Sequence, residues 1–311
     1  MFYFIVNITS RAGKAEKVWS MIENELRIRN VEYEAFLTSY EGHAGKIASK
    51  LCEKDTEKVN LVVVGGDGTV NEVLNGITDF DKIQFGYIPT GSGNDLGRGL
   101  GIGKDPLKIL DVILSGEHKR KMDIGSVTTE LDSTERFFAI SAGIGVDADV
   151  CKEALHSGLK KFLNQFGLGK LTYMILTVKR IFTMPALSAE LTIEDGENVG
   201  EHRNYHDVVF IAGMNHYAEG GGIPMAPMAS AFDGAFDVCI FWGHGRLQTL
   251  FMFPLLLTGR HEKVKRFEFI HSNEFTLHMK EPVVLHTDGE YGGTVHEIHF
   301  KCYKGKLNIL V

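Results

Sequence analysis

The five residues Gly65-Gly66-Asp67-Gly68-Thr69 carry the clearest chemistry in the sequence. They follow the apolar segment Leu61–Val64 and precede Val70–Ile77, which has the pattern of a short helix. Glycines between a strand and a helix let main-chain N–H groups surround an anion, and the helix adds its positive end. The Thr69 hydroxyl is a further donor, and Asp67 can hold Mg²⁺ through an oxygen or a bound water. This first glycine loop predicts a phosphate site; the simpler alternative is a turn in which Asp67 caps the helix.

A second glycine loop, Pro89-Thr90-Gly91-Ser92-Gly93-Asn94-Asp95, follows the next expected strand, Ile83–Ile88. Because ligands of open α/β sheets collect outside the carboxyl ends of the strands, both glycine loops are expected at one edge of a sheet. Ser92 could reach a phosphate there, and Asp95 could share a magnesium-bound water with Asp67. Taken alone, Asn94-Asp95 could be an ordinary helix N-cap, so the prediction depends on the two loops together.

A third polar group, His286-Thr287-Asp288-Gly289-Glu290, lies near the far end of the chain, after the apolar segment Val283–Leu285. Two carboxylates bracket a glycine in this group. A carboxylate placed against an acceptor hydroxyl can take its proton as a bond to phosphorus forms. The spacing alone is equally compatible with a turn that carries two solvated acids, so both interpretations stay open at this point.

The first 125 residues must position the two glycine loops, and they alternate strand and helix patterns. This order predicts a doubly wound, mostly parallel α/β sheet. Leu61–Val64 is apolar throughout, as expected for a strand that is covered on both faces. The expected strands are Phe2–Ile8, Val31–Thr38, Leu61–Val64 and Ile83–Ile88, and the expected helices are Lys14–Ile28, Ala44–Cys52, Val70–Ile77 and Pro106–Leu114.

From about Met122 the pattern changes to strands, which predicts a second, antiparallel β-rich domain. The expected boundaries are 1–125 for the α/β domain and 126–311 for the second domain, with the last segment returning to the first. The expected strands are Phe137–Ser141, Ala189–Ile193, Val208–Ala212, Phe236–Phe241, Phe267–Ile270, Phe275–Met279 and Val295–Cys302. Helices are expected around Val150–Gly158, Lys170–Phe182 and Leu247–Leu257.

The composition excludes several classes of protein. The net charge of −7 argues against nucleic acid as the main partner, and four scattered cysteines indicate neither a zinc ribbon nor a disulfide framework. The longest apolar run, Leu250–Leu257, is too short to span a membrane, so we expect a soluble, cytoplasmic protein. Glycine is the unusual residue, with 35 in 311, and predicts loops that approach something closely.

Several familiar motifs are missing or weak. The sequence has no GxxxxGK[ST], no GxSxG and no HExxH. Gly143-Ile144-Gly145-Val146-Asp147-Ala148 matches a dinucleotide-binding GxGxxA pattern, but it lies in mid-chain and no strand pattern follows at the required distance. We interpret it as a tight turn between a strand and a helix.

Taken together, these motifs resemble the diacylglycerol/sphingosine lipid kinase family, and specifically its small soluble bacterial members. The likeness covers essentially the whole chain in the expected order. GGDGT alone is less specific, because NAD kinases and phosphofructokinases also carry it. Asp288-Gly289-Glu290 and Asp233–Asp237 favour the lipid branch. The segments that carry the resemblance are Asn7–Gly13, Gly65–Val73, the second glycine loop, Met122–Gly125 and Asp288–Glu290.

The resemblance implies a role for each matching position. By similarity, the adenine nucleotide is lined by Asn7, Ile8, Thr9, Ser10, Arg11 and Thr38. Its phosphates are held by Gly65, Gly66, Asp67, Gly68, Thr69, Val70, Asn71, Glu72 and Ser92.

The resemblance also assigns catalytic and metal-binding acids. Asp288 matches the general base and Glu290 the nucleotide-side acid. Asp67, Asp95 and Asp123 match an acidic network around a catalytic Mg²⁺. Asp233, with the carbonyls of Ser230 and Ala235, matches a structural magnesium site. Two departures are Ile8-Thr9, where the family usually has Asn-Pro, and Ser92, where threonine is common.

The family also implies a fold and an activity. The expected fold is an NAD kinase/diacylglycerol kinase-like α/β domain with a β-sandwich-like second domain, and the expected activity is ATP- and Mg²⁺-dependent phosphorylation of a lipid hydroxyl. Diacylglycerol, ceramide-like lipids, phosphatidylglycerol and a polyprenol remain open as acceptors. The alternatives are a kinase for a soluble acceptor such as NAD and a non-catalytic nucleotide-binding regulator.

A soluble lipid kinase must reach its substrate at the inner face of the membrane. Two segments combine or concentrate basic residues, Leu168–Phe182 and Lys263-Val264-Lys265-Arg266, and could dock peripherally on anionic lipid. The alternative for each is a core helix and a solvated turn. A homodimer is compatible with the resemblance, and the sequence leaves the oligomeric state open.

Overall fold

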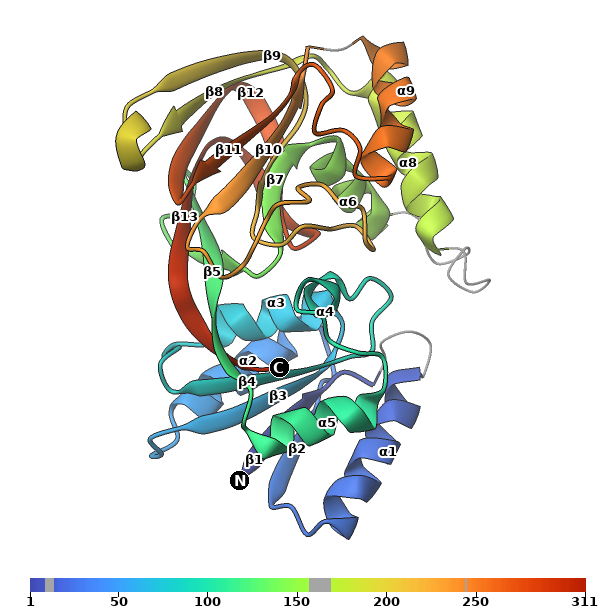
Figure 1. The fold of residues 1–311 in the computed structure, drawn as a ribbon, viewed down its shortest axis with the longest axis vertical. Helices are drawn as coiled ribbons and strands as arrows, with labels where there is room; N and C mark the ends of the chain where they lie inside the picture. Colours follow the sequence, from blue (N-terminus) through green and yellow to red (C-terminus); the bar gives the residue numbers. More distant parts are fainter. Residues whose placement is uncertain (9–13, 157–168, 244) are drawn as a thin grey trace. The chain divides into compact units, whose positions relative to one another are not determined.

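The chain forms two compact units, and its computed structural model describes residues 1–8, 14–156, 169–243 and 245–311 (Figure 1). Unit 1 comprises Met1–Ile124 and Lys304–Val311, and unit 2 comprises Gly125–Tyr303. Two strands carry the chain between the units, β5 (Lys119–Thr129) and β13 (Glu290–Leu310).

Unit 1 is built on a parallel sheet with the strand order β2-β1-β3-β4-β13. The C-terminal end of β13 pairs with β4, where Ile309 is the register partner of Phe85. The other strands are β1 (Phe2–Val6), β2 (Tyr33–Leu37), β3 (Val59–Gly65) and β4 (Ile83–Pro89), and the helices are α1 (Lys14–Ile28), α2 (His43–Cys52), α3 (Asp67–Gly76), α4 (Asp95–Gly99) and α5 (Pro106–Ser115).

The core of unit 1 explains why β3 is apolar throughout. Val62 and Val64 pack with Trp19 and Ile22 of α1 and with Leu110 of α5 on one face of the sheet. The alternate residues of β3 are also buried, and α3 packs against β3 and α2. Both faces of β3 are therefore covered, which holds the glycine-rich ends of β3 and β4 at one edge of the sheet.

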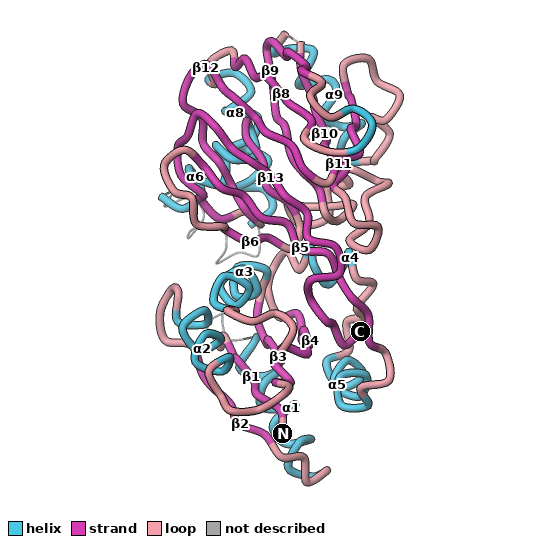
Figure 2. Tube along the Cα trace, turned by 90° about the vertical axis from the view of Figure 1, so that its left-hand side faces the viewer, coloured by secondary structure: helices cyan, strands magenta, loops and turns pink. Residues whose placement is uncertain are grey.

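Unit 2 is antiparallel, with the strand order β11-β10-β9-β7-β12-β13, and β8 pairs with both β12 and β9. Figure 2 shows its long strands in magenta. Its strands are β6 (Arg136–Phe138), β7 (Ser141–Gly145), β8 (Leu187–Ile193), β9 (His202–Met214), β10 (Phe236–Trp242), β11 (Phe267–Ser272) and β12 (Glu274–Thr287). Its helices are α6 (Val146–His156), α8 (Gly169–Thr183) and α9 (Arg246–Leu257), with a 3₁₀ turn at Gly196–Asn198.

Aromatic side chains fill the core of unit 2. Phe138 stacks on Phe236 at 5.5 Å between ring centroids, Phe236 meets Phe275 edge-on at 6.1 Å, and Phe275 stacks on Phe300 at 4.4 Å. These four rings come from β6, β10, β12 and β13 and are all fully buried. They fix the strands that lead into the β12–β13 turn, where Asp288 lies.

The predicted fold class, a doubly wound α/β domain with a second antiparallel domain, is confirmed. The interpretation of Gly143–Ala148 as a tight turn is also confirmed, because β7 ends at Gly145 and α6 begins at Val146. No helix in the described part of the chain has the length and apolar character needed to cross a membrane.

Three details differ from the sequence-based expectations. Phe137–Ser141, predicted as one strand, is divided between β6 and β7, because the main chain between them binds a side chain. Phe275–Met279 and Val283–Leu285 belong to one strand, β12, whose register is irregular around Pro282, as a proline inside a strand requires. Strand β5 was not predicted, and β13 extends well beyond the predicted Val295–Cys302 at both ends.

Candidate functional site

The two glycine loops pack directly against each other. The Thr90 N–H donates a hydrogen bond of 2.8 Å to the Gly65 carbonyl. A Cβ atom on Gly91 would lie 2.6 Å from the Gly66 Cα, closer than a real Cβ approaches backbone. Position 91 therefore needs glycine for the loops to meet, and a Cβ on Gly66 would also be tight, at 3.2 Å from the Gly91 Cα. The structure thus brings together the two loops on which the phosphate prediction depends.

Asp67 joins the two loops through its carboxylate. Its Oδ2 accepts the Asp95 N–H at 3.0 Å and its Oδ1 accepts the Leu96 N–H at 3.3 Å, so Asp67 caps α4. Asp67 is also the first residue of α3, whose N-cap residue is Gly66. Tyr87 lies against the same carboxylate, and burial together with the charge of Asp67 raises the pKa of Tyr87, which keeps its hydroxyl protonated.

Asp67 and Asp95 also converge on one small space. A Cβ atom on Gly93 would lie 3.1 Å from the Asp67 Oδ2 and 3.5 Å from the Asp95 Oδ2, so both oxygens face the volume that this missing Cβ would fill. The other oxygen of Asp95 accepts a hydrogen bond from Arg98. Two carboxylate oxygens beside a residue without a side chain suit a hard cation or its bound water.

Asp123 does not join this pair as a third direct ligand. Its Oδ1 accepts the Gly305 N–H at 2.6 Å, and its side chain is fully buried. Within the described residues, Asp67, Asp95 and Asp123 do not form a group whose ligand atoms all lie within 4.8 Å of one another. The bond to Gly305 ties Asp123 to the C-terminal strand of the same unit.

A cavity of about 270 Å³ opens beside the first glycine loop. Asn7 and Thr69 line it, and the Asn7 Nδ2 donates to the Thr69 Oγ1 at 3.0 Å. Three residues that the sequence did not single out also line it, because they directly follow Thr38 at the end of β2. The complete lining is Asn7, Thr38, Ser39, Tyr40, Glu41, Thr69 and Glu72.

The other predicted nucleotide residues have different surroundings. Ile8 is half-buried, whereas Thr9, Ser10 and Arg11 lie outside the described residues. Val70 and Asn71 are buried in unit 1, and Ser92 is exposed on the second glycine loop.

The Glu72 carboxylate is an anion that already has a main-chain partner. It accepts the Ala44 N–H at 3.1 Å, at the first turn of α2. A carboxylate repels a phosphate, so within residues 65–72 the groups suited to phosphate are main-chain N–H groups, the Thr69 hydroxyl and the Asn71 side-chain amide.

Asp288 occupies a two-residue turn between β12 and β13. Thr287 pairs with Glu290, and Asp288 and Gly289 both have positive φ, 51° and 81°, as the Asp-Gly sequence of a type I′ hairpin favours. The turn alternative is thus correct for the backbone, but the acid is not simply solvated.

The Asp288 carboxylate is held by three main-chain donors. The Ala139 N–H reaches its Oδ2 at 2.9 Å, and those of Ile140 and Ser141 reach its Oδ1 at 2.7 and 3.2 Å. These are the residues at which the predicted strand Phe137–Ser141 is interrupted. Hydrogen bonds from amides favour an ionised carboxylate and fix its orientation, which suits a base that must accept a proton from a defined direction.

Arg136 is a charged neighbour that the sequence did not single out. Burial lowers the pKa of Arg136, while the nearby charges of Glu290 and Asp288 oppose this shift. Its Nη1 donates to the Tyr291 carbonyl at 2.8 Å, which holds the guanidinium beside the turn. Asp288 and Glu290 therefore share one cation.

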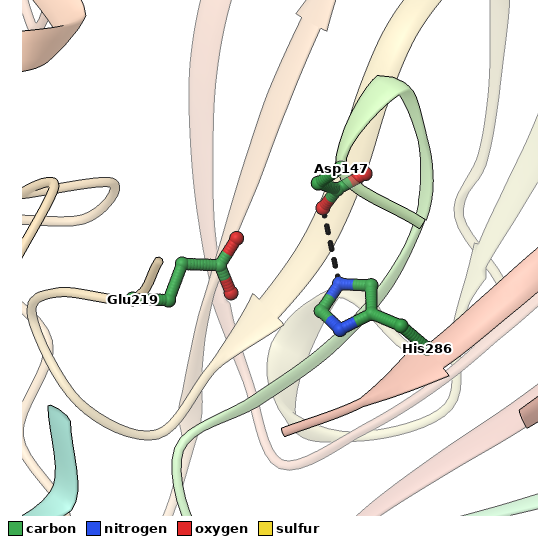
Figure 3. A group of neighbouring side chains, drawn as sticks. All are labelled: Asp147, Glu219 and His286. Atoms are coloured by element: carbon green, nitrogen blue, oxygen red, sulfur yellow. Dashed lines mark hydrogen bonds and ion pairs between the residues drawn. The ribbon is translucent and has the colours of Figure 1, made fainter. Parts of the chain in front are cut away.

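A second polar group of unit 2 is formed by Asp147, Glu219 and His286, and His286 lies two residues before Asp288 (Figure 3). It is the one group in the described chain in which three or more side chains of metal-binding type have ligand atoms within 4.8 Å of one another. The His286 Nε2 lies 3.1 Å from the Asp147 Oδ2, and the Ser141 hydroxyl donates to Glu219. Two of its members belong to segments that the sequence analysis singled out, Asp147 in Gly143–Ala148 and His286 in His286–Glu290, but no local pattern links the two segments.

Burial by itself lowers the pKa of His286. The charge and hydrogen bond of Asp147, together with the charges of Glu219 and Asp288, outweigh burial and raise this pKa to about 9. The Nδ1 atom lies 3.4 Å from the Gly289 N, a contact that only a neutral ring could accept. We favour the charged ring, because this long contact is weaker than an ion pair of 3.1 Å in a buried site.

The His286 ion pair predicts a pH-dependent stability. The folded pKa, about 9, exceeds the ordinary value of 6.5, so the stabilisation is complete below about pH 6.5 and is lost as the pH rises towards 9. The difference corresponds to about 3 kcal/mol. Urea unfolding across this range should show this loss in the wild type and little of it in His286→Gln. Burial lowers the pKa of His216 to about 4, so His216 changes the pH dependence of stability only at lower pH than this range. Equal slopes in the two proteins would contradict the assignment.

At the predicted structural magnesium site, the Asp233 carboxylate makes a local main-chain contact. The exposed Asp233 accepts the Ala235 N–H at 3.2 Å through its Oδ1, and Gly234 between them has a φ of 92°. Ser230 is half-buried in the same loop. The loop therefore turns tightly around the Asp233 carboxylate.

Each of the two units matches the model of a known protein family. Residues 1–127 match the family model of the diacylglycerol kinase catalytic domain, and residues 140–311 match that of the YegS C-terminal NAD kinase beta sandwich-like domain. The chain is 32% identical to YtlR of Bacillus subtilis (strain 168), named as a candidate lipid kinase, over 94% of each protein. It is 30% identical to a diacylglycerol kinase of Staphylococcus carnosus (strain TM300), over 93% of this chain and 88% of that one.

Solved structures show the same fold. A diacylglycerol kinase structure from Bacillus anthracis str. Sterne superposes with a TM-score of 0.70 at 17% identity and covers 99% of this chain and 96% of its own. An NAD kinase from Archaeoglobus fulgidus, solved in complex with ATP, gives a TM-score of 0.55 at 11% identity over 100% and 94% of the two chains. The chain belongs to the diacylglycerol kinase family of lipid kinases, as its motifs predicted.

Proposed function

We propose that this protein transfers the γ-phosphoryl group of ATP to the hydroxyl of diacylglycerol or a related lipid. The observation that carries the proposal is Asp288, whose carboxylate is fixed by three main-chain donors in the second unit of a lipid kinase family member. A carboxylate held in this way could accept the proton of an acceptor hydroxyl.

The nucleotide would bind at the glycine-loop edge of unit 1. The cavity beside Asn7 and Thr69 would take part of the adenine nucleotide, and the first glycine loop would present its N–H groups and the Thr69 hydroxyl to the phosphates. Asp67 and Asp95 face the space beside Gly93 and would hold Mg²⁺ or its waters there. Bound Mg²⁺ would neutralise charge on the phosphate oxygens.

At the acceptor, Asp288 would take the proton of the lipid hydroxyl. The hydroxyl oxygen would form a bond to the γ-phosphorus while the bond from that phosphorus to the β,γ-bridging oxygen breaks, and ADP would leave with that oxygen. Arg136 would limit the repulsion between Asp288 and Glu290. Most of the rate enhancement would come from positioning and charge neutralisation.

The two alternatives have less support. A kinase for NAD would share the fold, but the chain matches the diacylglycerol kinase catalytic domain and relatives named as lipid kinases. A non-catalytic regulator would not need Asp67, Asp288 and Glu290, all of which are present. We further propose a structural Mg²⁺ held by Asp233 and the carbonyls of Ser230 and Ala235, and a site of action at the cytoplasmic face of the membrane.

A lipid panel tests this proposal. The purified protein is incubated with γ-phosphate-labelled ATP, Mg²⁺ and micelles that contain diacylglycerol, ceramide, phosphatidylglycerol or a polyprenol. We expect label in the organic phase for at least one lipid, and its loss when a chelator removes Mg²⁺. The absence of label from every lipid, with nucleotide binding intact, would contradict the proposal.

A further inference from the structure

Helix α9 is apolar at nine of its twelve positions, yet few of these side chains are buried. Its sequence is RLQTLFMFPLLL, and only Thr249 and Leu256 are buried. Leu247 is 64% exposed and Phe251, one helical turn further on, is 73% exposed. A large aromatic side chain that is exposed to this extent, beside a second apolar residue on the same helical face, marks a surface that another body covers.

Helix α8 packs beside α9 and adds to this surface (Figure 1). The Arg246 side chain at the start of α9 donates to the Met184 carbonyl, directly after α8, at 3.4 Å. We define the α8–α9 surface by its exposed apolar residues, which are Ile175, Phe182, Leu247, Phe251 and Leu257.

The charge around this surface is opposite to that of the whole protein. Residues 169–183 and 246–266 contain eight Lys or Arg and one Asp or Glu, whereas the whole chain contains 33 and 40. The basic side chains after α9 are exposed, namely Arg260, Lys263, Lys265 and Arg266, and Arg246 at the start of α9 is exposed as well.

The cations of α8 are engaged differently. Lys179 and Arg180 both pair with Glu153 of α6, and Arg180 also lies 3.9 Å from Asp149. These contacts hold α8 against α6. The exposed basic charge therefore comes mainly from residues 260–266, which directly follow α9 in the chain.

We propose that the α8–α9 surface docks on an anionic lipid bilayer. Leu247 and Phe251 would enter the boundary between headgroups and acyl chains, and the basic segment 260–266 would contact lipid phosphates. A bilayer fits better than a protein partner, because a membrane surface offers both an acyl region for exposed apolar side chains and anionic headgroups for clustered Lys and Arg. This inference rests on the proposed function, since a lipid acceptor is found in a membrane.

Vesicle binding without ATP tests the docking separately from catalysis. The wild type should co-sediment with phosphatidylcholine vesicles that contain phosphatidylglycerol, and bind less to phosphatidylcholine alone or in high salt. Phe251→Asp should weaken this binding at least tenfold, on the order expected from losing one buried aromatic side chain. Lys263→Glu with Lys265→Glu should weaken it to a similar degree.

Leu131→Asp is the matched control, because Leu131 is 72% exposed and lies in the turn between β5 and β6. It should bind vesicles as the wild type does. Phe251→Asp should still phosphorylate a short-chain, water-soluble diacylglycerol at the wild-type rate, so a failed kinase assay and a failed docking assay are distinguishable. Unchanged vesicle binding by Phe251→Asp would overturn the proposal. So would light scattering that shows a wild-type dimer and a Phe251→Asp monomer, because the surface would then contact a second copy.

Discussion

Replacing Asp288 by asparagine should reduce lipid phosphorylation by roughly 10²–10⁴-fold, the range in which a general base contributes to an enzymatic rate. Asparagine has nearly the same shape and tolerates the positive φ of 51° at this position, but it cannot take a proton from the acceptor hydroxyl. ATP binding should change little, because the predicted nucleotide residues with described contacts belong mostly to unit 1. The measurement is the initial rate of label transfer to diacylglycerol, together with a titration of nucleotide binding.

The contacts of Asp288 also predict a cost in stability. An amide in place of Oδ2 would point an N–H group at the Ala139 N–H, which now donates to that oxygen at 2.9 Å. One unsatisfied donor costs about 1–3 kcal/mol, so Asp288→Asn should unfold at lower urea concentration but still be folded without urea.

Asp207→Asn is the control for this variant. Asp207 also has a positive φ, 52°, and is exposed in β9 of the same unit. It should keep both the activity and the stability of the wild type. Near-wild-type turnover by folded Asp288→Asn would remove Asp288 from the role of base.

Gly91→Ala should abolish most nucleotide binding, because the two glycine loops could no longer meet. The new Cβ would lie 2.6 Å from the Gly66 Cα and 2.9 Å from the Asn94 Oδ1, and the first of these is backbone that cannot rotate away. Overpacking of this kind costs about 1–3 kcal/mol of stability and displaces the loop that presents its N–H groups to the phosphates. We expect ATP affinity to fall at least tenfold, measured by calorimetry.

Gly103→Ala is the matched control for this variant. A Cβ on Gly103 would meet no atom within 4 Å, and Gly103 is exposed a few residues after α4. Its ATP affinity should equal that of the wild type, and its stability should change by less than about 0.5 kcal/mol. Normal ATP affinity in Gly91→Ala would show that the contact between the loops does not support the nucleotide site.

The parts of the fold that local pattern determines were predicted well. Helix Lys14–Ile28 was predicted with the limits that the structure shows, and the apolar run Leu61–Val64 lies inside β3 with both faces covered. The excess of glycine also predicted close backbone approach. Gly66 and Gly91 do allow such an approach, and the backbone that each of them approaches is that of the other glycine loop.

The contacts that escaped prediction join residues far apart in the sequence. The interruption near Ala139 depends on Asp288, which is 149 positions away, and no local pattern in Phe137–Ser141 signals it. Asp67 caps a helix that begins 28 positions later in the chain. The pair of His286 with Asp147 likewise needs the fold to bring β12 next to α6.

The choice between diacylglycerol and NAD as acceptor is the most direct test of the proposed activity. The measurement is the ratio of initial rates for the two acceptors, under the same concentrations of labelled ATP and Mg²⁺, with lipid and aqueous products separated by extraction. We predict rapid labelling of the lipid phase and none of the nucleotide. Labelled NADP as the main product, with an unlabelled lipid phase, would contradict the assignment of this chain as a lipid kinase.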